Sequence, residues 1–396
     1  MQDLDITRSL LDEIISIAKE YEQYSILAEH LEFKKWTYCL RAGEKEFDQM
    51  QKEIDSCEEA RRNYSIAYDY VARLNMLYEF SGRRDEEKIR QHFKKAIPDV
   101  QRKQSASNSS IILYYLKVLM MDYEMLNKNY LKARSICLEL IEVVKGNKSV
   151  FTKRRLGTAY DHLATCEMLL GRFDHALEHT RIALEFIPEG IYNYTLSRQW
   201  EFYALFYNKQ YSDAAACAEN MIASARKKEM GGFRWEKFYF LLANAHFKIR
   251  DFEKTLIVLD NKFEIKEDKE GWEFNWRVLQ IMANVELNNL MPDHGDTASK
   301  QVERIRNLFR SNEKKVSFTP RQKNIYKFLS FAEQKGFDFS QLNGKGENYL
   351  EQLSSETSAD GWQVLSSELI PFHEWAIDKM KSKKKLQRKN PHSAKP

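Results

Sequence analysis

Apolar residues recur along the chain at spacings of three and four, which is the period of one face of an α-helix. Ile111, Tyr115, Leu119 and Tyr123 illustrate the pattern, because they form one row on a single side of a helix. Alternating β-branched and polar residues with Asn-Gly or Asp-Gly turns, the mark of strands and hairpins, are missing. Gly and Pro, at 14 and 7 of 396 residues, are scarce enough for long helices. The sequence therefore predicts an all-α protein.

The N-terminal part reads as a group of helices that ends at a short polar stretch. Its periodicity predicts helices over about residues 6–22, 24–56, 58–80 and 85–97. The residues from Ser105 to Ser110 are small and mostly polar, follow Pro98, and disfavour both burial and helix interiors. We therefore expect a boundary there, after an N-terminal helical region over 1–104.

The residues from 157 to 188 contain the clearest internal repeat unit. Small side chains let two antiparallel helices approach closely, a glycine permits a left-handed helix end, and a proline stops a helix. An aromatic side chain fills the gap at the turn between the helices. The positions that follow this scheme are Tyr160, Leu163, Ala164, Gly171, Phe173, Ala176, Ala183 and Pro188. The unit therefore predicts a helical hairpin.

Three weaker copies of the turn flank this unit. The aromatic residues of the four turns are Tyr130, Phe173, Tyr211 and Phe252, which are 43, 38 and 41 residues apart. The pattern resembles the tetratricopeptide repeat (TPR) family, with irregular units longer than the 34 residues typical of that family. The resemblance is best at residues 157–188 and implies a right-handed α-solenoid of TPR-like helical hairpins, joined to an N-terminal helical bundle region.

The rest of the chain is divided on the same reasoning. We expect a TPR-like repeat array over 111–290 and C-terminal helices that cap the array over 291–378. The last helix is expected over about Gly361 to Lys381, with a kink or a restart at Pro371.

In TPR proteins the inner face of the first helix of each hairpin lines a concave groove that receives an extended peptide or a partner helix. Among the positions below, Lys237, Asn244 and Lys248 are similar to those that hold a C-terminal carboxylate in some members, with a solvated helix face as the alternative. Tyr203 and Phe240 are expected to be exposed aromatic anchors. The positions that the resemblance carries into the groove are Tyr115, Asp122, Asp161, His162, Thr165, Gln199, Tyr203, Phe206, Lys237, Phe240, Asn244 and Lys248.

Two short motifs are candidates for chemistry. His175-Ala-Leu-Glu178-His179 matches the H-x-x-E-H pattern of zinc peptidases, but it lies on the second helix of the clearest repeat and lacks a third ligand. His162 and Cys166 are one turn apart, and no neighbour in sequence orients the histidine, which favours Cys166 as a core residue. No Gly-rich phosphate loop follows a strand. We expect no catalytic residue, no bound metal and no cofactor.

Composition indicates the compartment in which the protein resides. Charges interrupt every apolar run before it reaches the roughly 20 residues that cross a bilayer, and the start shows no basic segment ahead of an apolar one. Five cysteines without a CxxC pair fit thiols of a reducing cytoplasm. We therefore expect a soluble, cytoplasmic protein without a transmembrane segment.

The net charge of +4 is unevenly placed. Residues 379–396 hold eight basic residues and no acid, so this tail carries +8 and the other 378 residues carry −4. Its composition predicts a disordered tail that makes at most weak contacts with anionic surfaces. The acidic balance of the body argues against specific nucleic-acid binding by the repeats.

These features together predict a non-enzymatic helical-repeat scaffold or adaptor that binds a protein or peptide in the groove. The alternative is a peptide-responsive bacterial regulatory receptor, in which a peptide bound by the repeats repositions the N-terminal helical region. Only the layout of the chain supports this alternative, because residues 1–104 carry no motif of a known output domain.

Overall fold

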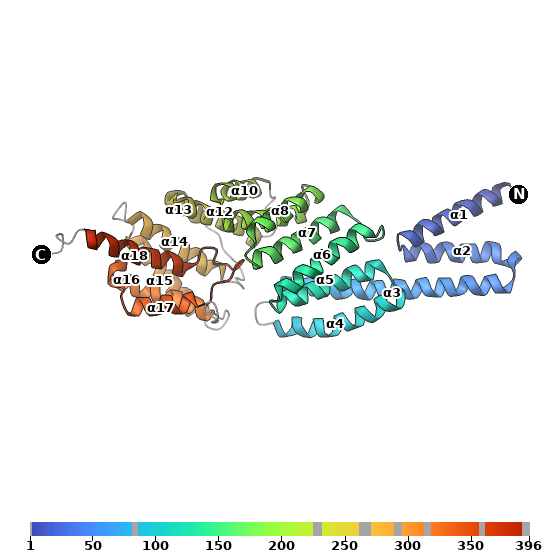
Figure 1. Ribbon diagram of the computed structural model, residues 1–396, viewed down its shortest axis with the longest axis horizontal. Coiled ribbons are helices and arrows are strands. Elements are labelled where there is room, and N and C mark those ends of the chain that lie inside the picture. The colour runs from blue at the N-terminus through green and yellow to red at the C-terminus, as the bar shows by residue number, and fades with distance from the viewer. Residues whose placement is uncertain are drawn as a thin grey trace. The chain divides into compact units, whose positions relative to one another are not determined.

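A computed structural model describes residues 2–80, 86–224, 232–260, 271–288, 295–312, 318–355 and 361–389. The regular elements within these ranges are helices, as the apolar periodicity predicts (Figure 1). Two compact units divide the chain, unit 1 (Met1–Ser197) and unit 2 (Arg198–Pro396). None of the helices within the described ranges is both long and apolar enough to cross a membrane.

Unit 1 consists of successive helices that pack against their neighbours in the chain. The most extensive contacts join α2 to α3, α5 to α6, and α7 to α8. The helices are α1 (Gln2–Glu20), α2 (Tyr24–Ala42), α3 (Glu44–Phe80), α4 (Glu86–Ser107), α5 (Ser110–Leu126), α6 (Tyr130–Gly146), α7 (Lys153–Leu169), α8 (Phe173–Phe186) and the first residues of α9 (Tyr192–Tyr207).

Two helix boundaries near the N-terminus differ from the prediction. The helix expected over 24–56 breaks at Gly43, whose φ of 105° is a conformation that glycine adopts easily. Because the break comes early, α3 is a single helix of 37 residues. The helix expected to end near residue 97 continues through Pro98, since the buried side chains of Phe93, Ala96 and Val100 lie on both sides of the proline. Packing of this face outweighs the missing backbone hydrogen bond.

Two separate apolar cores lie among the described residues of α1 to α7. The larger core runs from the second half of α3 through α7, from Ala67 to Cys166, and is continuous across residues 105–110. The polar stretch is therefore a connection between α4 and α5 within one core, and the division into domains stays a prediction. The smaller core joins α1, α2 and the first half of α3, and its buried members are Leu11, Ile15, Ala18, Leu27, Ala28, Leu31, Ile54 and Cys57.

The four predicted turns have the same geometry. Each aromatic residue that marks a turn is the first residue of the second helix of its hairpin: Tyr130, Phe173, Tyr211 and Phe252. Two positions earlier the backbone is left-handed in every case, with φ between 60° and 73° at Lys128, Gly171, Lys209 and Arg250. The next amide donates to a carbonyl five residues back at 2.8 to 3.0 Å, which is the Schellman ending of a helix.

The small residues behind these turns pack the two helices of each hairpin. The third residue after each aromatic is fully buried, with 0% of its surface exposed, and the four residues are Ala133, Ala176, Ala214 and Thr255. Small side chains here let the helix axes approach. The hairpins predicted from the sequence are therefore confirmed.

Unit 2 continues the series of hairpins and ends in a long helix. It begins with the last residues of α9. The helices that follow are α10 (Tyr211–Ser224), α12 (Gly232–Ile249), α13 (Phe252–Leu259), α14 (Trp272–Asn288), α15 (Gly295–Asn312), α16 (Pro320–Gln334), the short 3-10 helix η3 (Phe339–Gln341), α17 (Lys345–Ser354) and α18 (Phe372–Lys389). A threonine caps α16, because Thr319 and Gln322 form a reciprocal capping box.

The C-terminal part departs from the prediction in two ways. Residues 361–371 are not helical, and α18 begins directly after Pro371, which disfavours a helical conformation in the residue before it. The tail expected to be disordered from residue 379 is helical as far as Lys389. Met380 is buried, and Lys379 forms an ion pair with Glu286, so packing orders its beginning. Residues 390–396 lie outside the described residues.

Candidate functional site

We call the side of α5 and α7 that carries the predicted groove residues, together with the neighbouring α3, the inner face of unit 1. Tyr115 of α5 is buried within a group of tyrosine rings, with centroids 6.0 Å from Tyr64, 5.9 Å from Tyr68 and 5.3 Å from Tyr114. Tyr68 on α3 keeps 51% of its surface exposed. This face therefore carries an exposed aromatic side chain, Tyr68, beside the predicted groove residue Tyr115.

Two carboxyl groups on this face have unusual surroundings. Asp161 is buried on α7, and its Oδ2 accepts a hydrogen bond of 2.5 Å from Ser197 Oγ. Its other oxygen, Oδ1, is buried and has no hydrogen-bond partner among the described residues. Burial raises the pKa of Asp161 to about 7, and burial likewise raises the pKa of Asp122 on α5 to about 7. Both groups therefore change charge near neutral pH.

The other two predicted groove residues of unit 1 are uncharged. Burial lowers the pKa of His162 to about 4, so its imidazole is neutral at pH 7. Thr165 Oγ1 donates to the backbone carbonyl of Asp161 at 2.9 Å, within its own helix. The role of these residues in a binding groove stays a prediction, and the sequence did not indicate the burial that sets their charge.

In unit 2 the corresponding positions are buried. Gln199, Tyr203, Phe206, Phe240 and Asn244 are all buried, and Tyr203 and Phe240 are each only 2% exposed. The expectation that Tyr203 and Phe240 are exposed anchors is wrong. Phe240 packs instead against the rings of Trp272 and Trp276, with both centroid distances at 5.7 Å.

The three residues compared with a carboxylate clamp have other contacts. Lys237 Nζ lies 4.7 Å from the ring centroid of Trp272, and Lys248 Nζ lies 5.2 Å from that of Tyr211. Both are cation–π distances. Asn244 Nδ2 donates to the carbonyl of Phe240 at 2.8 Å, within its own helix. A carboxylate clamp at these residues stays a prediction.

A non-helical segment of the chain lies against part of the side of unit 2 that carries the predicted groove residues, which we call the inner face of unit 2. We call residues 361–371 the strap. Leu365 N donates to the Tyr207 hydroxyl at 3.2 Å, and the Trp362 ring meets the Tyr207 ring edge-on at 6.0 Å. Asn275 Nδ2 donates to Ser367 Oγ at 2.8 Å. The strap thus contacts first helices of several hairpins through both its main chain and its side chains.

The strap fits closely against this face. A cavity of about 10 Å³, hardly more than one water molecule needs, lies between it and the helices. Its lining consists of Phe240, Asn244, Asn275, Val278, Leu279 and Met282 from α12 and α14, and residues 367–370 from the strap. Two predicted groove residues, Phe240 and Asn244, therefore lie beneath a segment of the same chain.

A buried ion pair holds the strap at its centre. Arg321 Nε and Nη2 donate to Glu368 Oε2 and Oε1 at 2.6 and 2.7 Å, and each side chain is only 9% exposed. Arg321 Nη1 also donates to the Leu353 carbonyl at 2.8 Å, and Glu368 Oε1 accepts from Phe372 N. Sequence analysis missed the strap, although Pro371 and the pair Ser366-Ser367 were signals against a helix there.

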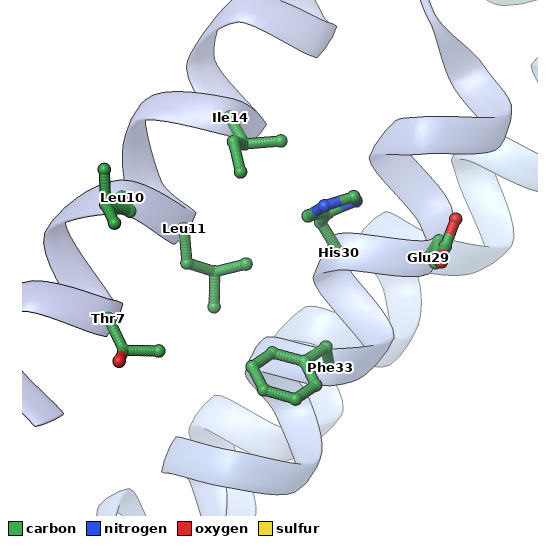
Figure 2. Close-up of a pocket in the computed structure, with 7 residues that line it drawn as sticks. All are labelled: Thr7, Leu10, Leu11, Ile14, Glu29, His30 and Phe33. Carbon is green, nitrogen blue, oxygen red and sulfur yellow. The ribbon is translucent and has the colours of Figure 1, made fainter.

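A second hollow lies between α1 and α2, away from the repeats. It has a volume of about 440 Å³ and is lined by Thr7, Leu10, Leu11, Ile14, Glu29, His30 and Phe33. Figure 2 shows Leu11 and Ile14 of α1 pointing toward α2, which carries His30 and Phe33. Leu10 and Phe33 are more than half exposed. Sequence analysis gave no role to this apolar surface.

The motifs weighed for chemistry lie where the sequence expected them. His175 and Glu178 are exposed on α8, and His179 lies beside the ring of Tyr160. Among the described residues, no three His, Cys, Asp or Glu side chains gather as a metal site requires. Cys166 is fully buried, with its sulfur 3.8 Å from that of Cys137, so its assignment to the core is confirmed.

Comparison with known proteins identifies the fold. No family model matches the sequence, and no curated protein matches it. A Rap protein solved with the competence and sporulation factor aligns over 93% of this chain and 99% of its own, with a TM-score of 0.53 and 11% identity. The apo form of RapI aligns over 97% and 99% with a TM-score of 0.49 and 11% identity. The Rap conjugation regulator of plasmid pLS20, solved with the Phr* peptide, aligns over 83% and 97% with a TM-score of 0.42 and 12% identity.

The first of these likenesses and the helical hairpins agree on the fold class. The chain is an all-α solenoid of TPR-like hairpins that follow an N-terminal helical region. The fold class predicted from the sequence is confirmed.

Proposed function

We propose that this chain is a non-enzymatic protein that binds an extended peptide, or an extended segment of a protein partner, on the inner faces of its helical repeats. In this proposal the repeats are divergent TPR units, no cofactor takes part and nucleic acid is not a specific partner. A cytoplasmic location in a bacterium belongs to the same proposal.

One observation carries the proposal: a non-helical stretch, the strap, already lies on the inner face of unit 2. The surface holds it through Tyr207, Asn275 and Arg321, which bond to both backbone and side-chain groups. These are the kinds of contacts by which repeat proteins hold extended peptides. The Rap protein of similar fold was solved with the competence and sporulation factor, which is in keeping with this reading.

The test uses matched pairs of residues from the two helices of a hairpin. Peptides that bind the full chain are selected from a displayed library, and their affinities are measured by fluorescence anisotropy. We expect His162→Ala on α7 and Lys237→Ala on α12 to weaken binding at least tenfold. Substitution of His175 on α8 or Lys254 on α13 by alanine is expected to change affinity less than twofold. Equal effects in both groups of variants would show that the inner faces are not the binding surface.

A second function is favoured by one contact: a receptor in which peptide binding repositions α1 and α2. Glu22, in the turn between these helices, accepts hydrogen bonds from the hydroxyls of Tyr24, Ser109 and Ser149 and from the amide of Ser110. Burial acts to raise the pKa of Glu22, but these hydrogen bonds outweigh it and lower the pKa below its ordinary value. One carboxylate thus ties the turn between α1 and α2 to the start of α5.

Small-angle X-ray scattering with and without a selected peptide tests this receptor function. We expect Glu22→Gln to change the scattering curve of the peptide-free protein toward that of the peptide-bound form. A curve unaffected by both the peptide and the substitution would exclude the receptor and leave the simple binding protein.

A further inference from the structure

We propose that the strap is an intramolecular ligand of unit 2, and that the face beneath it takes extended peptides in which an acidic residue is followed by two aliphatic residues. The inference rests on the proposed function, because it treats this face as a peptide-binding surface. It goes further by naming the competitor that the chain itself supplies and the chemistry of the peptide.

The strap lies across the first helices of four successive hairpins. Tyr207 on α9 accepts from the backbone of Leu365, α12 and α14 line the small cavity under residues 367–370, and Arg321 on α16 holds Glu368. A peptide bound by helical repeats is read in the same way, by several consecutive repeats at once. The strap therefore occupies the surface as a bound peptide would.

The side chains at the centre of the strap define what this face recognises. Arg321 presents its planar fork to Glu368, an arrangement matched to a carboxylate. Leu369 and Ile370 follow immediately and are buried, and both line the cavity with Val278. The face therefore reads a carboxylate followed by two aliphatic side chains.

The beginning of the strap is held less firmly than its centre. Residues 361–366 are half-buried or exposed, whereas residues 367–370 are buried. Leu365 has a φ of 64°, a left-handed conformation that is unfavourable for a bulky residue and that detachment would relieve. The helix after the strap has its own anchor, because Trp375 Nε1 donates to Glu286 Oε1 at 2.7 Å. The strap can therefore leave the face while α18 stays attached.

The test measures binding of the strap sequence added in trans. A labelled peptide, Gly-Trp-Gln-Val-Leu-Ser-Ser-Glu-Leu-Ile-Pro, is titrated into the wild-type chain and into a full-length variant that carries Ser367→Gly, Glu368→Gly and Leu369→Gly. We expect the variant to bind at least tenfold more tightly than the wild type, since its own strap no longer competes. A peptide with lysine in place of the glutamate is expected to bind the variant at least tenfold more weakly. A variant with wild-type helicity and no gain in affinity would overturn the inference.

Hydrogen exchange on the wild-type chain tests the same point without a substitution. We expect amides of residues 361–370 to exchange at least tenfold faster than those of α14, because the strap opens while the helices stay folded. Equal exchange rates in the two segments would mean that the strap is part of the core, and the inference would be wrong.

The two experiments separate this inference from the proposed function. If the wild type and the variant bind the strap peptide equally well, the face binds peptides but the strap does not compete, so only the inference fails. If the folded variant binds neither this peptide nor any library peptide, the proposed function fails at this face as well.

Discussion

The inner faces of units 1 and 2 are built from helical hairpins of the same kind, but different groups lie on the two faces. In unit 1, Asp161 and His162 have pKa values shifted by burial, and one oxygen of Asp161 has no partner among the described residues. In unit 2, the strap lies against part of the face, and a buried ion pair between Arg321 and Glu368 holds it there. The repeated turn fixes where the first helices stand, whereas the groups placed on those helices decide what the face can accept.

The contacts that stabilise the two units also differ in position: in unit 1 they lie between the two helices of a hairpin, and in unit 2 they lie on the inner face. Behind the face of unit 1, Gly157 of α7 lies so close to α8 that an added Cβ would stand 2.4 Å from Ile187 Cγ1 and 3.0 Å from the Ala183 carbonyl oxygen. In unit 2 the strong contact of Arg321 is on the front, with the strap. Substitutions on the front and on the back should therefore act differently in the two units.

The largest effect is expected from Arg321→Ala. Removing one partner leaves Glu368 as a buried carboxylate without its ion pair, which costs about 3 to 5 kcal/mol. Six of the seven tryptophans belong to unit 2, so denaturation followed by tryptophan fluorescence reports on this unit. Lys254→Ala on α13 of the same unit, which removes an ion pair whose lysine is largely exposed, is the control and should cost only a small part of this free energy. Equal costs would show that the pair does not hold the strap.

Gly157→Ala should destabilise unit 1 by about 2 to 3 kcal/mol, because the new methyl group overpacks the contact between α7 and α8. Hydrogen exchange of the α7 and α8 amides measures the loss. Gly146→Ala is the matched control, since a Cβ there meets nothing within 4 Å and α6 gains a better helix former. A stable Gly157→Ala variant would mean that the two helices move apart at little cost.

The next effect concerns the dependence of stability on pH in unit 1. The pKa of Asp161 is about 7 in the folded chain against an ordinary value of 3.8, so between these values the folded state binds more protons than the unfolded state. Stability from this group is therefore lost as pH rises from about 4 to 7. Asp161→Asn should remove this loss and be more stable than the wild type at pH 8 by an amount on the order of 2 kcal/mol.

His162 has the opposite effect on the pH dependence of stability, so a substitution there is a check on the prediction for Asp161. Its pKa is about 4 in the folded chain and 6.5 ordinarily, so its contribution is present above pH 6.5 and lost as pH falls toward 4. Both groups act between about pH 4 and 7 and have opposite signs. In urea denaturation followed by circular dichroism between pH 4 and 8, the stability of Asp161→Asn should therefore fall less with rising pH than that of the wild type, and the stability of His162→Gln should rise less. Identical profiles for both variants would contradict the assigned pKa shifts.

The hairpins could be predicted because their signals are local. A left-handed residue, an aromatic two positions later and a small residue three positions after that, as in Gly171, Phe173 and Ala176, satisfy backbone and packing rules within one turn. Even Lys128, Lys209 and Arg250 adopt the left-handed conformation without glycine, so the aromatic and small residues were sufficient markers.

The strap and the buried anchors could not be predicted because they depend on distant partners. The contact between Glu368 and Arg321 joins residues 47 positions apart, and Tyr207 bonds to a backbone amide 158 positions away. Helical periodicity says nothing about such contacts, which is why the expectation of exposure is wrong for the aromatic residues Tyr203 and Phe240. A residue carried over from a family pattern keeps its place on the helix, but its exposure is set by the segment that covers it.

The smallest predicted effect distinguishes a structural from a binding role for Lys237. Its ammonium group lies 4.7 Å from the Trp272 ring centroid, a contact expected to contribute about 0.5 to 1 kcal/mol to unit 2. Lys237→Gln should lower stability by this amount in the fluorescence assay, Lys237→Arg should not, and Lys323→Gln at an exposed site on α16 should have no effect. If Lys237→Gln leaves stability unchanged but weakens peptide binding, the lysine serves the ligand rather than the fold, and the face of unit 2 is more open to ligands than the strap alone indicates.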